Sequence, residues 1–89
     1  MGENPSVKGK KFVITGEIPG MDRKQAAAAL KALGASVTGS VSGKTDYVIT
    51  GENPGENKLE AAEEHGVPLL DHEQFARLLA GDDLEEVAG

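Results

Sequence analysis

The sequence predicts an α/β fold, a single domain in which a parallel sheet is flanked by helices. Short apolar runs rich in β-branched residues alternate with longer segments of helical periodicity, an order typical of a parallel sheet covered on both faces. Three of the helical segments begin with the Asp/Asn-x-x-Gln/Glu pattern of a capping box. A length of 89 residues suits one domain with one modest core.

Four strands are expected from the apolar runs. They are Lys11–Thr15, Ala35–Thr38, Asp46–Thr50 and Val67–Leu70. The first and third strands are expected to lie side by side and parallel, with their carboxyl ends at one edge of the sheet. Open α/β sheets bind ligands at such an edge, where the chain order reverses.

Three helices are expected, each between a capping residue and a glycine. Their caps are Asp22, Asn57 and Asp71, the box partners are Gln25, Glu60 and Gln74, and the helices end at Gly34, Gly66 and Gly81. The right-handed crossover rule places the first helix on one face of the sheet, between the first two strands. Residues 1–7 and 82–89 are expected to be a polar and an acidic tail, which leaves residues 8–81 as the domain.

Two nearly identical stretches occupy the ends of the first and third strands. VITGEIPG spans Val13–Gly20 and VITGENPG spans Val48–Gly55, with seven of eight residues in common. No larger repeat surrounds them, so they indicate two similar strand ends and not a duplicated unit. Their Thr-Gly pairs are expected to flank the edge at which a ligand would bind.

The net charge of −6 is unevenly distributed. Residues 1–51 contain seven Lys/Arg and four Asp/Glu, whereas residues 52–89 contain two and eleven. This pattern argues against a general basic surface for nucleic acid but allows a local anion site in the first half. The chain has no cysteine and no long apolar run, so a disulfide framework, a thiolate zinc site and a membrane span are not expected.

The residues that catalysis needs are missing. The two histidines, His65 and His72, have no serine nucleophile pattern and no metal-ligand spacing beside them, and both are expected at the surface. The stretch Gly51–Lys58 departs from a P-loop because its lysine does not directly follow the second glycine. The chain is therefore predicted to be a non-catalytic module with no cofactor and no metal.

Cations at two predicted helix starts favour an anion site. Arg23 and Lys24 open the first helix and Lys58 opens the second, although a helix dipole disfavours positive charge there by ~0.3–1 kcal/mol. Both helix starts are expected near Thr15 and Gly16, at the end of the first strand. A hydroxyl, a free amide and several cations together suit a phosphate. The residues alone leave open the alternative that these cations only face solvent.

The chain resembles a BRCT domain over about residues 8–80. The resemblance rests on KGKKFVITG, the Leu33-Gly34-Ala35 turn, VTGSVSGKTDYVITGENPG, KLEAAEEHGVPLLD, and Phe75, where many members have tryptophan. It implies a four-stranded parallel sheet in strand order 2-1-3-4. It also implies that the first and third helices lie on one face of the sheet and the second on the other.

Within the family, the chain is most similar to the branch found in bacterial NAD-dependent DNA ligases and in the large subunit of the eukaryotic clamp loader. Members of that branch bind the 5′-phosphate of duplex DNA. The resemblance implies that the Thr15 hydroxyl, the Gly16 amide and Lys58 bind the phosphate and that Arg23 contacts DNA; Lys24 completes the predicted set. Lys58 comes one residue later than in the G-x-x-x-G-S-K-L pattern of the ligases, a spacing more similar to the clamp loader.

These observations predict a monomeric interaction module of a cytoplasmic, nucleoid-associated bacterial replication or repair protein, with an NAD-dependent DNA ligase as the first candidate parent. The expected partner is 5′-phosphorylated duplex DNA, and no membrane is involved. The alternatives are a module that binds a phosphopeptide, a protein surface or other domains of its parent, and a docking domain with a vestigial pocket. Thr50–Gly51 is expected to serve packing and turn formation, not a second site.

Overall fold

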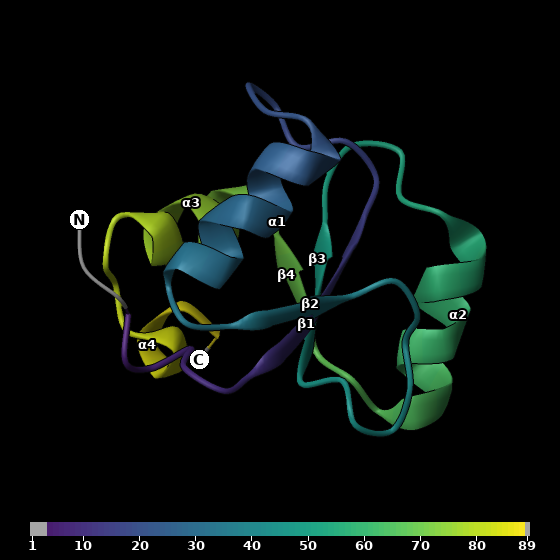
Figure 1. Ribbon diagram of the computed structural model, residues 1–89. Coiled ribbons are helices and arrows are strands. Elements are labelled where there is room, and N and C mark those ends of the chain that lie inside the picture. Colours follow the sequence, from purple (N-terminus) through teal and green to yellow (C-terminus); the bar gives the residue numbers. More distant parts are fainter. Residues whose placement is uncertain (1–3, 89) are drawn as a thin grey trace.

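The computed structural model describes residues 4–88 and has the predicted α/β architecture (Figure 1). Its elements are β1 (Lys11–Thr15), α1 (Arg23–Ala32), β2 (Ser36–Thr38), β3 (Tyr47–Thr50), α2 (Glu56–His65), β4 (Leu69–Asp71), α3 (His72–Leu79) and α4 (Leu84–Ala88). The four strands pair in parallel in the order β2-β1-β3-β4, which confirms the predicted topology.

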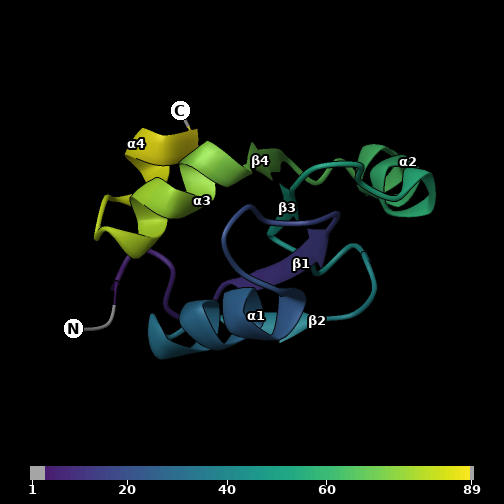
Figure 2. The same cartoon turned by 90° about the horizontal axis from the view of Figure 1, so that it is seen from above.

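The sheet is the middle of three layers. Seen from above, α2 lies on one side of the strands, and α1, α3 and α4 lie on the other (Figure 2). Successive residues of β1 alternate between the two faces: Phe12 and Ile14 belong to the main core with α1 and α3, whereas Val13 belongs to a smaller core against α2. Both faces of the sheet are therefore buried, as expected of a parallel sheet.

The predicted capping boxes are present at α1 and α3. The Asp22 carboxylate accepts from the Gln25 amide at 2.8 Å, and the Gln25 side chain accepts from the Asp22 amide at 2.9 Å. Asp71 and Gln74 make the same two contacts at 2.8 and 2.9 Å. Each box satisfies amides that the first helical turn leaves without partners.

Helix α2 starts differently from the prediction. Its cap is Gly55 instead of Asn57, the helix begins at Glu56, and no side chain caps its first turn. The Gly55 amide donates to the Thr15 hydroxyl oxygen at 2.8 Å. This contact between residues far apart in the sequence fixes the helix start, and a local sequence pattern does not reveal it.

Several strand bounds also shift. β2 and β3 each begin one residue later than predicted, and β4 begins two residues later, at Leu69, and ends one residue later, at Asp71. Pro68 precedes β4 and has no amide to donate to a ladder, although its carbonyl accepts from the Val48 amide at 3.0 Å. Val67 lies before the strand and packs into the smaller core.

The two segments expected as tails pack against the domain, contrary to the prediction. Val7 from the first, and Leu84 and Val87 from the second, are buried in the main core beside α3. Residues 84–88 form α4, and Gln74 Nε2 of α3 donates to the Val87 carbonyl at 2.8 Å. The apolar face of α3 gives the reason, because without these segments it would be open to water. Residues 1–3 and 89 lie outside the described part of the chain.

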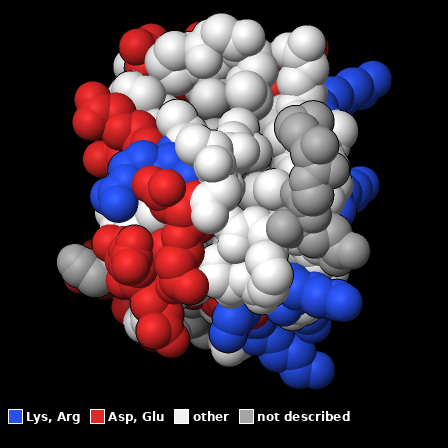
Figure 3. All heavy atoms as spheres, turned by 90° about the vertical axis from the view of Figure 1, so that its left-hand side faces the viewer, with Lys and Arg blue, Asp and Glu red and all other residues white. Residues whose placement is uncertain are grey.

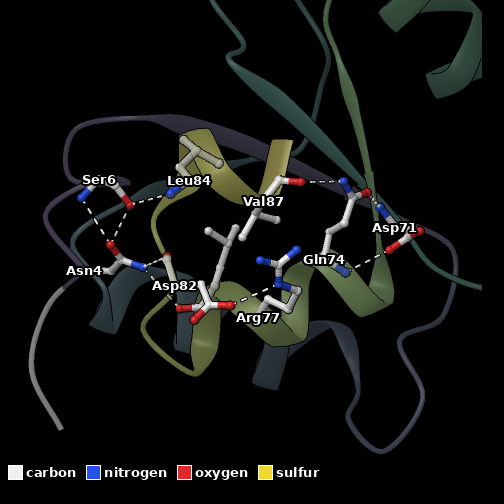
Figure 4. A network of polar contacts seen from close by, with 9 residues as sticks. Asn4, Ser6, Asp71, Gln74, Arg77, Asp82, Leu84 and Val87 are labelled. Carbon is white, nitrogen blue, oxygen red and sulfur yellow. Dashed lines mark hydrogen bonds and ion pairs between the residues drawn. The ribbon is translucent and has the colours of Figure 1, made fainter. Parts of the chain in front are cut away.

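A polar network joins the first described residues to the end of α3 (Figure 4). Asn4 is 5% exposed, and its Nδ2 donates to the carbonyls of Leu78 (3.2 Å) and Asp82 (2.8 Å). Ser6 Oγ donates to Asn4 Oδ1 at 2.6 Å and accepts from the Leu84 amide at 2.9 Å. The two ends of the domain therefore lie together and stabilise each other.

Candidate functional site

An open cavity of about 760 Å³ lies at the carboxyl edge of the sheet, between the end of β1 and the starts of α1 and α2. It is lined by Thr15, Gly16, Glu17, Arg23, Asn53, Gly55, Glu56, Asn57 and Lys58. Four of the five predicted site residues are thus brought together. The fifth, Lys24, is exposed on α1 and does not line the cavity.

Thr15 provides a hydroxyl at the base of the cavity. Its residue is only 2% exposed, and its Oγ1 accepts from the Gly55 amide at 2.8 Å. Because a hydroxyl has one hydrogen to donate and this contact uses only a lone pair, the hydrogen is left for another acceptor. The contact also fixes the direction of the hydroxyl.

Gly16 adds a backbone amide. β1 pairs with β2 only as far as Val13–Thr38, so the Gly16 amide lies beyond the end of the neighbouring strand. Within residues 4–88, no acceptor takes that amide. The residue has φ of +82°, and a Cβ there would lie 2.6 Å from the Glu52 carbonyl oxygen. Only glycine fits this position, and its amide is left for a ligand.

The start of α2 supplies further donors. Because no side chain caps this helix, the amides of its first turn have no capping partner, and Glu56, Asn57 and Lys58 line the cavity. By contrast, the Asp22 carboxylate already occupies the start of α1. The α2 end is therefore the helix terminus that can bind an anion.

Two cations reach the cavity from the two helices. Lys58 is held in place, since its Nζ donates to the Gly39 carbonyl at 2.8 Å and keeps two further hydrogens for other acceptors. Arg23 is the first residue of α1 and is exposed at the rim. A dianion in the cavity would have an ammonium and a guanidinium beside it.

Two carboxylates, which sequence reasoning missed, share the lining. Glu17 follows Gly16, Glu56 follows Gly55, and both are exposed. Their charges oppose an anion and offset those of Lys58 and Arg23. The positions were visible in the sequence beside the predicted glycines, but strand and helix patterns give no sign that the two carboxylates converge.

The second Thr-Gly pair makes different contacts from the first. Thr50 Oγ1 donates to the Leu70 carbonyl at 3.2 Å, so its hydroxyl is used within the sheet. The two turns that follow the pairs cross: the Glu17 amide donates to the Glu52 carbonyl at 2.9 Å, and the Glu52 amide donates to the Glu17 carbonyl at 2.7 Å. A Cβ on Gly51 would collide with the Glu17 backbone. We call this arrangement the glycine crossing.

Metal-ligating groups, the two histidines and the apolar character of the helices bear on the other expectations about chemistry. Within residues 4–88, no group of His, Asp or Glu could hold a metal ion. His65 is exposed at the end of α2, and His72 is partly exposed at the start of α3. None of the helices described here has the length and apolar character to span a membrane.

Comparison with known proteins gives a family and a fold. The model of the BRCA1 C Terminus (BRCT) domain matches residues 4–79. Two solved structures share the fold: the second XRCC1 BRCT domain, with a TM-score of 0.71 at 20% identity over 94% of this chain and 85% of that one, and the C-terminal BRCT domain of human XRCC1, with a TM-score of 0.70 at 19% identity over 93% and 85%.

Three curated relatives are each named DNA ligase. The one from Alkalilimnicola ehrlichii is 53% identical over 78 residues, which is 88% of this chain and 11% of the relative. The one from Natronomonas pharaonis is 42% identical over 80 residues, with 90% and 12% covered. The one from Synechococcus sp. is 50% identical over 88 residues, with 94% and 12% covered. The chain thus spans about a tenth of the length of these relatives.

Proposed function

The chain belongs to the BRCT domain family, and on that premise we propose that it is a non-catalytic module of a DNA ligase that binds the 5′-phosphate of a duplex DNA end or nick. The relatives support the ligase as parent. Chemical sealing of a strand break would then lie outside these residues. The phosphate site itself is proposed from the geometry of the cavity.

The observation that carries the proposal is the set of unused donors around one cavity. The Thr15 hydroxyl, the Gly16 amide, the first-turn amides of α2 and the Lys58 ammonium all border it. Each contributes a hydrogen that the fold leaves available, and a terminal phosphate has three oxygens to accept them. Arg23 at the rim suits the next phosphate along the strand.

The two carboxylates in the cavity lining lower the affinity expected for DNA. With Glu17 and Glu56 in the lining and a net charge of −6, the long-range field does not attract DNA. The preference for a terminal phosphate must come from the short contacts inside the cavity. We therefore expect weak binding by the isolated domain that is lost at physiological salt.

The test compares ligands that differ only at the terminus. Wild-type domain is titrated at low salt with a 5′-phosphorylated duplex and with the same duplex ending in a 5′-hydroxyl, and amide chemical shifts are followed. We expect tighter binding of the phosphorylated duplex, with the largest shifts at Gly16 and at residues 55–58. Equal binding of the two duplexes would refute the proposal.

A phosphopeptide provides the second arm of the same experiment. A serine-phosphorylated peptide offers the same terminal oxygens without the DNA backbone that Arg23 would contact. Tighter binding of this peptide than of the phosphorylated duplex would replace the DNA proposal with a peptide-binding module.

A further inference from the structure

Positive and negative charges lie on different sides of the molecule. Residues 4–38, which comprise the first segment, β1, α1 and β2, contain six Lys/Arg and two Asp/Glu. Residues 69–88, which comprise β4, α3 and α4, contain one and six. On the face shown in Figure 3, acidic side chains gather on one side, and basic ones follow the opposite and lower edges. The division separates the α1 side from the α3–α4 side.

Five of the cations lie along α1 or just past its end, and the first of them borders the cavity. Arg23 lines the cavity, and Lys24 follows it on α1. Lys31 lies seven residues after Lys24, which is two helical turns, so both project from the same exposed face about 10.5 Å apart along the axis.

The other two lie past the end of α1. Lys8 and Lys10 flank Gly9, whose amide donates to the Gly34 carbonyl at 3.0 Å, directly after the helix. Both lysines are exposed. We call Arg23, Lys24, Lys31, Lys8 and Lys10 the basic strip. The only ion pair within residues 4–88 joins Arg77 to Asp82 on the other side of the molecule, so no cation of the strip is held in an ion pair.

We propose that the basic strip binds the sugar-phosphate backbone of duplex DNA whose terminal 5′-phosphate occupies the cavity. This inference rests on the proposed function and extends it from the terminal phosphate to the duplex behind it. Phosphates of one strand advance about 3.4 Å per nucleotide along the duplex axis, so the distance from Lys24 to Lys31 corresponds to about three nucleotides. The acidic α3–α4 side then faces away from the DNA, because its charge repels the phosphates.

The strip and the cavity make separable contributions to binding. Contacts to backbone phosphates are independent of sequence and of the chemistry at the terminus. The strip should therefore add the same free energy for 5′-phosphate and 5′-hydroxyl duplexes, whereas the cavity should distinguish them. A 5′-phosphorylated dinucleotide should fill the cavity without reaching Lys31.

The test uses the triple variant Lys8→Gln/Lys10→Gln/Lys31→Gln, with Lys44→Gln as the matched control. Lys44 is also exposed, but it follows Gly43 in the loop beside His65 at the far end of α2. Both proteins and the wild type are titrated with a 16-base-pair 5′-phosphorylated duplex, the 5′-hydroxyl duplex and the phosphorylated dinucleotide over a salt series. Thermal melts establish whether each variant is folded. If the triple variant does not fold, the single variant Lys31→Gln replaces it in the titrations.

The triple variant should bind both duplexes roughly tenfold more weakly at low salt. Its plot of log K against log salt should be flatter by about 0.9 for each phosphate that the variant no longer neutralises. Dinucleotide binding should be unchanged. The proposal for the basic strip would be refuted if the triple variant bound the duplexes as tightly as the wild type does. It would also be refuted if the triple variant lost no more affinity than Lys44→Gln. Failure of the cavity proposal is distinguishable, since it appears in the wild type as the lack of any preference for a 5′-phosphate.

Discussion

Replacement of Thr15 by valine tests the cavity most directly, with Thr50→Val as the control. Valine keeps the β-branched shape that suits a strand and removes only the hydroxyl. In Thr15→Val the hydrogen bond with the Gly55 amide at 2.8 Å disappears, and in Thr50→Val the one with the Leu70 carbonyl at 3.2 Å disappears. The two variants are therefore matched in residue type, strand position and number of protein hydrogen bonds removed, and only Thr15 borders the cavity.

The expected magnitudes follow from these hydrogen bonds. Each variant should lose about 0.5–1.5 kcal/mol of unfolding free energy, the usual net value of one intramolecular hydrogen bond. A hydrogen bond to a charged group is worth about 1.5–3 kcal/mol. Thr15→Val should therefore bind the 5′-phosphorylated duplex roughly 10- to 150-fold more weakly. Thr50→Val should bind it as the wild type does.

The affinity of each variant for 5′-phosphorylated and 5′-hydroxyl duplexes is measured by isothermal titration calorimetry or by fluorescence titration. The unfolding free energy of each variant is measured by urea unfolding. Thr15→Val should lose its preference for the phosphorylated terminus, and Thr15→Ser, which retains a hydroxyl, should keep most of it. Similar decreases in affinity in Thr15→Val and Thr50→Val, or no decrease in either, would show that the Thr15 hydroxyl does not bind the ligand.

Four further substitutions test neighbouring contacts. Lys58→Ala should weaken phosphate binding yet change the unfolding free energy by less than ~1 kcal/mol, because the lost hydrogen bond to Gly39 is offset by removal of a positive charge that the α2 dipole disfavours. If thermal melts showed a larger destabilisation and titrations showed unchanged affinity, Lys58 would have a structural role only. Glu17→Gln should tighten binding of the phosphorylated duplex about 2- to 5-fold, since one opposing charge is removed, and a weaker complex in the same titration would contradict this. Gly51→Ala should cost about 1–3 kcal/mol in urea unfolding because its Cβ meets the Glu17 backbone, more than Gly39→Ala, where a Cβ has no neighbour within 4 Å. Asn4→Ala should cost about 1–3 kcal/mol by the same measurement, and an unchanged midpoint would mean that the first segment does not stabilise the fold.

The sequence predicted the architecture because its signals were local. The Asp22 and Asp71 capping boxes involve residues three apart, and the strand runs carry their own apolar pattern. The start of α2 was predicted wrongly for the complementary reason: Asn57 and Glu60 match the box pattern, but a bond between residues 15 and 55 decides where the helix begins.

The chain ends show the same limit. Asn4 contacts residues 74 and 78 positions away, and a polar segment without periodicity gives no sign of such partners. In the candidate site, family resemblance indicated Thr15 and Lys58, and the structure places both at one cavity. The opposing carboxylates and the uncapped helix start became visible only when the loops were placed in space.

The glycine crossing makes the edge of the cavity part of the sheet and not a free loop. Each turn is held by a backbone hydrogen bond to a carbonyl of the other, directly beyond the paired central strands β1 and β3. A ligand therefore meets donors that are already fixed, and little conformational entropy is lost when it binds. The reciprocity also accounts for the glycine in both copies of VITGE, because each glycine makes room for the carbonyl of the opposite copy.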